Sequence, residues 1–204
     1  LAEAGDEFTS AGLLRAGLEL MDAPDIRAVA VDEIQQLSGG AWREVLRPGV
    51  NLDLLQSLPV MMARHWLVRR EVLVEAGGYR ADFSDALEYE LLLRLIEQGG
   101  LSGLAHLDEP LLIARAPELK HNEHARQALA RHLSARGYKA QVISAQPGAL
   151  RVDYRHMERP QVSIILRSED NQDSLQRCLE SVLQRTRYLR YEVLAVSYTH
   201  LRAH

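Results

Sequence analysis

The chain has 204 residues, 47% hydrophobic and 25% charged, with a formal net charge of −4. This is a globular composition with room for one or two cores, and nothing in its charge balance points to nucleic acid or an anionic membrane surface as a partner. The single cysteine, Cys178, excludes an intrachain disulfide and suits a reducing compartment, and no apolar run approaches the roughly 20 residues of a membrane span. The chain starts at Leu1 rather than Met, so we expect the true N-terminus to lie upstream.

The first part of the chain alternates between helical and extended patterns. Leu13, Leu14, Leu18 and Met21 share one helical face, and Asn51 is a favoured N-cap residue. The predicted elements, in order, are a helix ending near Asp22, a strand over 26–31 that ends at Asp32 and Glu33, a loop over 34–51, a short helix ending at Leu55, a strand over 61–68 and a short helix over 69–76.

The second part opens with the clearest helix of the chain. It runs over 86–98, with Leu87, Leu91 and Leu95 inward and Gly99-Gly100 as its C-cap. The predicted elements after it are short apolar pieces near Leu104 and at 111–114, a helix over 118–136, strands over 139–144 and 150–154, a buried strand over 162–166, a helix around 175–183 and a strand over 191–196. The last three form a strand–helix–strand unit, the start of a right-handed parallel fold.

This last unit carries the most specific motif. Residues 160–170 read PQVSIILRSED, residues 175–186 read LQRCLESVLQRT, and residues 191–196 read YEVLAV. They resemble the first β-α-β of family 2 glycosyltransferases, whose pattern runs P-x-V-S-I-I-I-P-T-x-D, L-x-x-C-L-x-S-L-L-x-x-T and Y-E-I-x-V-V-D. Residues 197–204, SYTHLRAH, break the pattern and resemble sequencing-adapter read-through, so we expect a non-native tail.

The front of the chain resembles the other half of the same family's domain. Residues 3–6, EAGD, fall where the family has a D-x-D-D turn. Residues 69–79 resemble R-R-x-x-x-x-x-x-G-G-F, and residues 86–95, ALEYELLLRL, resemble a helix that opens with an acidic element and continues L-x-x-R-L. The resemblance implies an incomplete α/β, GT-A-like (Rossmann-like) fold with a mostly parallel sheet and flanking helices. It also implies the C-terminal half of one transferase domain at 1–116, a helical linker at 117–159, and the start of a second domain at 160–196.

The resemblance further implies transfer of a sugar from a nucleotide-sugar donor to a hydroxyl of a glycan or lipid-linked acceptor. A carboxylate must then take the proton of the attacking hydroxyl, and Glu88 is the candidate base, placed where a helix dipole favours a carboxylate. The alternative is a first-turn Glu that only stabilises this dipole. Glu90 is expected on the surface, and Asp85 at the helix N-cap.

The family also uses a divalent metal, Mg or Mn, against the leaving diphosphate. Glu3 and Asp6 align with its acidic ligands, but Gly5 stands at the second Asp, and Ile113 stands at a His that often completes the metal shell. The alternative for Glu3 and Asp6 is a solvated acidic turn.

The remaining candidates bind substrate. Gly77, Gly78 and Tyr79 are assigned to the acceptor, because a glycine pair lets backbone approach a sugar and a Tyr ring can stack on one; the alternative is a plain helix C-cap. Ser168 and Asp170 follow the first strand of the second domain and are assigned to the nucleotide. Asp32 and Glu33 are taken as structural.

The resemblance places the protein in the cytoplasm, at the inner face of a membrane that a larger parent protein contacts peripherally. The competing hypothesis is a degenerate, non-catalytic module that holds a glycan or partner, supported by Gly5 and Ile113 at metal positions. An unrelated α/β regulator is a third reading, since short β-α-β signals recur widely.

Overall fold

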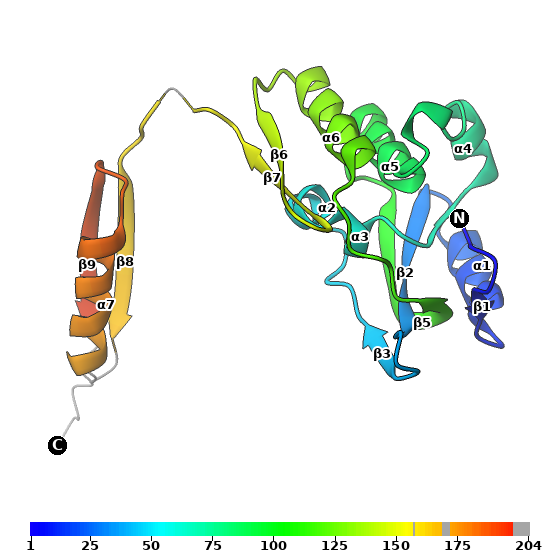
Figure 1. Cartoon of the computed structure of the whole chain (residues 1–204), viewed down its shortest axis with the longest axis horizontal. Coiled ribbons are helices and arrows are strands. Elements are labelled where there is room, and N and C mark those ends of the chain that lie inside the picture. The colour runs from blue at the N-terminus through cyan, green and yellow to red at the C-terminus, as the bar shows by residue number, and fades with distance from the viewer. Residues whose placement is uncertain (157, 169–171, 198–204) are drawn as a thin grey trace. The chain divides into compact units, whose positions relative to one another are not determined.

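The computed structural model describes residues 1–156, 158–168 and 172–197, in two compact units, Leu1–Arg155 and His156–His204 (Figure 1). The boundary therefore falls after residue 155. None of the helices in the described ranges has the length and apolarity needed to cross a bilayer. The tail assigned to 197–204 lies, apart from Ser197, outside the described residues.

The sheet of the first unit is mixed. Its strands are β1 (Glu7–Phe8), β2 (Ala28–Gln36), β3 (Trp42–Val45), β4 (Trp66–Val68) and β5 (Leu104–Arg115). The central strand β2 pairs in parallel with β5 and antiparallel with β3 and β4, while β1 pairs antiparallel with β5. The expectation of a mostly parallel sheet is therefore wrong for this unit. Strands β2 and β3 are joined by a short hairpin and therefore pair antiparallel, whereas the parallel partner β5 is reached through a long helical connection.

Helices cover both faces of this sheet (Figure 1). Ala28 and Ala30 pack in a large core with α5 (Leu87–Gly99), whereas Val31 packs in a small cluster with Ala16 of α1 (Gly12–Asp22). Successive side chains of a strand point to opposite faces, so α5 and α1 lie on opposite sides of β2.

The predicted local signals of the first unit are largely confirmed. The helices are α2 (Leu52–Ser57), α3 (Pro59–Met62), α4 (Arg70–Glu75) and a 3-10 turn, η1 (Ala81–Phe83). Asn51 caps α2, since its side chain accepts a 2.9 Å hydrogen bond from the Leu54 amide. Gly100 ends α5 with a φ of 61°. The predicted strand over 61–68 is only partly right, because its first residues belong to α3.

Residues 117–155, expected as a linker, pack onto the same core. They form α6 (Glu123–Ala135), β6 (Gln141–Gln146) and β7 (Ala149–Asp153). Leu129 and Leu133 of α6, Val142 of β6 and Leu150 of β7 are buried among the side chains of α5. Both strands were predicted, and the structure pairs them as an antiparallel hairpin.

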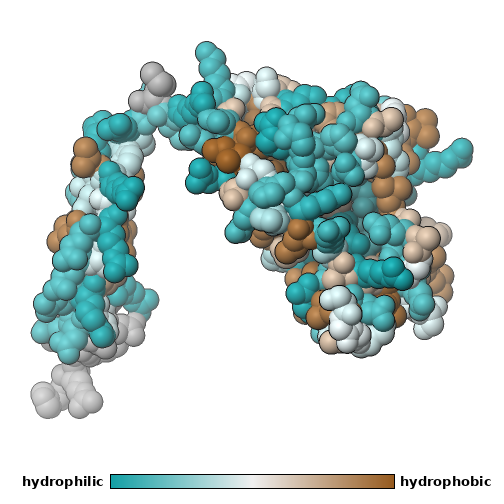
Figure 2. Space-filling view, in the orientation of Figure 1, coloured by the Kyte–Doolittle hydropathy of each residue, from teal (hydrophilic) through white to brown (hydrophobic). Residues whose placement is uncertain are grey.

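The apolar face of α1 is exposed, whereas an apolar helix face is normally expected to be buried. Leu13, Leu14, Leu18 and Met21 are all exposed, and Figure 2 shows hydrophobic side chains on the surface in this part of the unit. The side of α1 that meets the sheet carries Gly12 and Ala16 instead. Small residues allow close approach here, since a Cβ on Gly12 would lie 2.6 Å from the Leu111 carbonyl oxygen.

The second unit is the predicted β-α-β. It consists of β8 (Val162–Ser168), α7 (Gln172–Arg185) and β9 (Tyr191–Ser197), and the two strands pair in parallel from Val162 opposite Tyr191 onward. Its side chains are not buried as expected, because α7 buries none of its described residues and Ile165 of β8 is 67% exposed. Two strands and one helix provide too little apolar surface for a core.

The prediction that Glu90 lies on the surface is wrong, because its side chain is fully buried. Its carboxylate lies 2.7 Å from Arg94 of the same helix, 2.7 Å from Arg131 of α6 and 3.4 Å from Arg80. Burial acts to raise the pKa of Glu90, but hydrogen bonds from Arg94 and Arg131 outweigh burial and lower it. The carboxylate thereby joins α5 to α6.

Replacing Glu90 by Ala leaves the buried guanidinium of Arg94 without its carboxylate, and breaking a buried pair in this way costs about 3–5 kcal/mol. We expect Glu90→Ala to lower the free energy of unfolding by that amount in urea titrations. The matched control is Glu19→Ala, which removes an exposed partner of Arg15 on α1 and is expected to leave the urea midpoint nearly unchanged. Equal midpoints for Glu90→Ala and the wild type would contradict this role.

The second unit is expected to open far more readily than the first. Because no described side chain of β8, α7 or β9 is buried, their amides are predicted to exchange hydrogen at least about tenfold faster than those of β2 and β5. Hydrogen-exchange mass spectrometry measures both units in one experiment. The β6–β7 hairpin is the internal control, because it is also two-stranded but packs on a core, and similar exchange in both two-stranded elements would contradict the prediction.

Candidate active site

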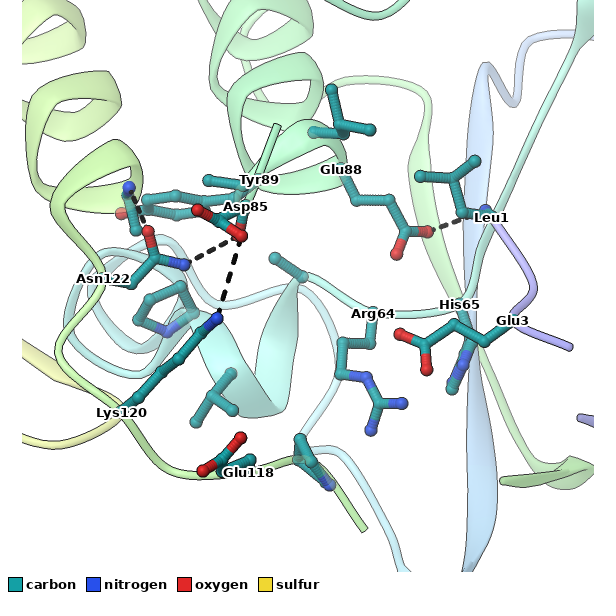
Figure 3. A pocket seen from close by; sticks show the side chains of 18 of the residues that line it. Leu1, Glu3, Arg64, His65, Asp85, Glu88, Tyr89, Glu118, Lys120 and Asn122 are labelled. Atoms are coloured by element: carbon teal, nitrogen blue, oxygen red, sulfur yellow. Dashed lines mark hydrogen bonds and ion pairs between the residues drawn. The ribbon is translucent and has the colours of Figure 1, made fainter. Parts of the chain in front are cut away.

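A pocket of about 660 Å³ lies at the start of α5 (Figure 3). Five segments of the first unit line it: the first three residues, the stretch before β4, the start of α5, the connection between β5 and α6, and the β6–β7 hairpin. The segments contribute carboxylates, cations and apolar side chains from positions more than 100 residues apart. The pocket is therefore a product of the tertiary fold.

Glu88 lies in the first turn of α5, as predicted, and it projects into this pocket. Its side chain is 15% exposed, and its Oε1 accepts hydrogen bonds from the Leu1 amino group at 3.0 Å and the Trp66 amide at 3.3 Å. The second carboxylate oxygen points toward the pocket (Figure 3). The Trp66 amide thus orients one oxygen of the carboxylate, and the other oxygen faces the cavity.

The two acids of the N-terminal turn face different ways. Glu3 lines the pocket and points into it (Figure 3). The Asp6 side chain is only 4% exposed; its Oδ2 accepts a 2.7 Å hydrogen bond from the Glu3 amide and lies 3.5 Å from Nε2 of His65. The turn is therefore closed by Asp6 and presents Glu3 alone to the cavity.

This arrangement does not fit the divalent metal that the resemblance implies. Mg²⁺ and Mn²⁺ need several oxygen ligands that converge on one point. Among the described residues no three His, Cys, Asp or Glu side chains are grouped as a metal site, and Asp6 is engaged by His65 and the turn. No chemical step below is assigned to a metal.

A buried polar cluster stands behind the pocket, and the sequence analysis did not identify it. Its members, called here the Glu33 cluster, are Asp6, Glu33, Gln35, Arg47, Arg64 and His65. Glu33 Oε1 accepts a 2.5 Å hydrogen bond from Gln35, Oε2 contacts Nδ1 of His65, and Arg47 lies 3.3 Å away. Glu33 is 1% exposed, so each of these contacts replaces water.

His65 takes a left-handed backbone conformation, with a φ of 58°, that is uncommon outside glycine. Its ring lies between Glu33 and Asp6 and so ties β2 to the N-terminal turn. The sequence predicts a strand over 61–68 and gives no signal at His65. A local pattern offers none, because both partners are distant in sequence.

The cluster keeps Glu33 ionised. Burial acts to raise its pKa, but hydrogen bonds from His65 and Gln35 and the charge of Arg47 outweigh burial and lower the pKa to about 2. Asp32 is buried as well and accepts hydrogen bonds from the Arg47 amide at 2.8 Å and from His106, whose Nε2 lies 2.7 Å away. Neither residue ends its strand as predicted, because β2 continues to Gln36 with register shifts against β5 at Asp32.

The predicted acceptor residues lie at the end of α4. Gly77 and Gly78 have φ angles of 83° and 71°, and the Gly78 carbonyl oxygen accepts a 2.7 Å hydrogen bond from Arg94. None of Gly77, Gly78 and Tyr79 is among the residues that line the pocket. Burial, and to a smaller extent the charge of Glu88, raises the pKa of Tyr79. Acceptor binding by these three residues stays a prediction.

The remaining predicted positions are accounted for as follows. Asp85 is not the N-cap of α5, which is Ala86; its carboxylate pairs instead with His124 at 3.3 Å and Lys120 at 3.7 Å. Ser168 ends β8 in the second unit, and Asp170 lies outside the described residues. Nucleotide binding by these two residues stays a prediction.

Comparison with known proteins gives two curated relatives and no matching family model. The chain is 33% identical over 206 aligned positions, 95% of its length, to the O-antigen biosynthesis protein RfbC of Myxococcus xanthus. It is 29% identical over 94% of its length to the uncharacterized protein y4gI of Sinorhizobium fredii. The chain spans only 16% of the first relative and 22% of the second.

The depressed pKa of Glu33 predicts a pH-dependent contribution to stability. A carboxyl whose pKa falls on folding stabilises the fold while it is ionised, and it loses that contribution as the pH drops from its ordinary value of 4.5 to about 2. The interval corresponds to about 3 kcal/mol. Urea unfolding is therefore expected to show Glu33→Gln less stable than the wild type by about this amount at pH 7, with the difference shrinking below pH 4.5.

Glu44→Gln is the matched control, because Glu44 is exposed on β3. It is expected to unfold like the wild type across the same pH range. A Glu33→Gln difference that stays constant down to pH 2 would rule out an ionised Glu33 as its source.

Proposed function

We propose that this chain is part of a family 2 glycosyltransferase of GT-A type, which moves a hexosyl unit from a nucleotide-sugar donor to an acceptor hydroxyl in polysaccharide or glycan assembly. The observation that carries the proposal is Glu88, a carboxylate held by Trp66 on one oxygen and open to the pocket on the other. Similarity to an O-antigen biosynthesis protein over 95% of the chain supports the glycan context.

In the proposed reaction the acceptor hydroxyl enters the pocket beside Glu88. The free carboxylate oxygen takes its proton while the hydroxyl oxygen forms a bond to the anomeric carbon of the donor sugar. The bond between that carbon and the diphosphate oxygen breaks, and the diphosphate leaves with the electron pair. A single displacement of this kind inverts the anomeric configuration.

The site suits Glu88 to this role in two ways. The first turn of α5 places the carboxylate at the positive end of the helix dipole, which favours the ionised form that a base requires. The Trp66 amide restricts the orientation of the Glu88 carboxylate, so the side chain loses less conformational entropy when an acceptor binds.

The substrates follow from the proposed reaction. The donor is a nucleotide sugar, the acceptor is a glycan or lipid-linked glycan, and Gly77, Gly78 and Tyr79 are proposed to contact it. The second unit is proposed to open another transferase domain that contacts a nucleotide through Ser168 and Asp170. Transfer to a lipid-linked acceptor would take place at the cytoplasmic face of a membrane, with the larger protein bound there peripherally.

A second candidate is a degenerate transferase domain that binds a glycan without reacting. Gly5 and Ile113 at the family's metal positions, together with the inward Asp6, favour it. The two candidates differ in turnover. The non-catalytic module would bind glycan equally well with or without the Glu88 carboxylate and would release no nucleotide.

Glu88→Gln in a longer protein that contains this chain tests the base. Loss of a general base typically lowers turnover by about 10²–10⁴-fold, and we expect a fall in that range with little change in donor affinity. Glycosyl transfer and nucleotide release are measured with a panel of nucleotide sugars. Glu75→Gln, at an exposed position of α4, is the matched control and is expected to keep full turnover.

Turnover of Glu88→Gln equal to that of the wild type would remove Glu88 from the catalytic role. Glycan binding without any nucleotide release by the wild type would favour the non-catalytic module.

A further inference from the structure

Arg64 has an unusual environment for a largely buried arginine. Its side chain is 15% exposed and lines the pocket, and no hydrogen bond to it is found among the described residues. The nearest acceptor is Glu33 Oε1, 3.6 Å from Nη1, which is beyond hydrogen-bonding distance. Nη1 is itself a buried atom without a hydrogen-bond partner.

Arg47 also has one buried nitrogen, Nη2, without a hydrogen-bond partner, but its other nitrogens donate to Val31 and Met61. Three further arginines of this unit have several acceptors each. Arg27 donates to three backbone carbonyl groups, those of Leu95, Gly100 and Ser102. Arg69 and Arg94 likewise donate to several carbonyl oxygens each. The guanidinium of Arg64 instead lines the pocket, where it can donate hydrogen bonds to an acceptor that enters.

The surroundings narrow the choice of acceptor. Glu33 lies 3.6 Å from the Arg64 guanidinium on the side away from the pocket. On the pocket side, Figure 3 shows the Arg64 side chain between Glu3 and Glu118. Lys120, another cation of the pocket, is paired with Asp85. A guanidinium with open donors matches two oxygens of a phosphoryl group through parallel N–H bonds, a geometry that a lysine ammonium does not reproduce.

We propose that Arg64 binds the diphosphate group of the donor and supplies the positive charge that the sequence resemblance had assigned to a divalent metal. The identification of the anion rests on the proposed function. As the bond from the anomeric carbon to the diphosphate oxygen breaks, the negative charge grows on that oxygen. A fixed guanidinium beside it stabilises the leaving group without reorganising.

With Arg64 in this position, the proposed transfer does not need a metal ion at Glu3 and Asp6. Asp6 points inward and Glu3 stands alone, so the turn offers too few oxygen ligands for a cation. Arg64 lies in the same pocket as Glu3 and Glu88. A cationic side chain takes the place of a metal ion in this arrangement.

Binding of inorganic pyrophosphate to the 204-residue chain tests the proposal without requiring turnover. Isothermal titration calorimetry with excess EDTA is expected to detect binding by the wild type, at least tenfold weaker binding by Arg64→Gln, and intermediate binding by Arg64→Lys. Arg15→Gln removes the same charge from α1, outside the pocket, and is expected to bind like the wild type. Thermal melting confirms that each variant is folded.

The proposal is overturned if the wild type binds pyrophosphate only after Mg²⁺ or Mn²⁺ is added, does not bind it at all, or binds it no better than Arg64→Gln. Should Arg64→Gln not fold, phenylglyoxal labelling of the wild type replaces it. Pyrophosphate is then expected to slow modification of Arg64 and not of Arg15, and equal slowing would overturn the proposal. A failed transfer assay leaves this binding result intact, so the two proposals fail separately.

Discussion

The region around the pocket depends on one buried, ionised carboxylate, that of Glu33. An unpaired charge at this depth would be strongly destabilising, so Glu33 requires Gln35, Arg47 and His65 at hydrogen-bonding or ion-pair distance. These partners come from β2 itself, the segment after β3 and the segment before β4. Pairing the Glu33 carboxylate therefore also fixes the positions of the segments that carry Arg47 and His65.

The same requirement determines which polar groups are available for chemistry. His65, held by Glu33, turns Asp6 inward and removes it from the pocket, while Glu3 and Glu88 stay open to it. Glu33 also stands behind Arg64 at 3.6 Å without occupying its donors. The buried cluster thus separates structural carboxylates from those that can meet a substrate.

Patterns local in the chain predicted most elements well. The cap at Asn51, the helix that carries Glu88 and the separate elements β6, β7, β8, α7 and β9 each depend on residues a few positions apart. The errors have another origin. Glu90 was predicted on the surface because two of its partners, Arg80 before η1 and Arg131 of α6, are distant from it in the sequence. Strand β3 was predicted as loop because an exposed edge strand forms only by pairing with its neighbour, here β2.

The sequence by itself determined the order of the elements and the position of Glu88 in the first turn of α5, since helix periodicity and capping act within a few residues. Only the tertiary structure decided that Asp6 faces His65 rather than the cavity, and that Arg64 lines the pocket with unfilled donors. The physical reason is that residues 6, 33 and 65 meet through strand pairing and a left-handed turn at His65. Such partners are set by the whole fold and leave no periodic mark in the chain.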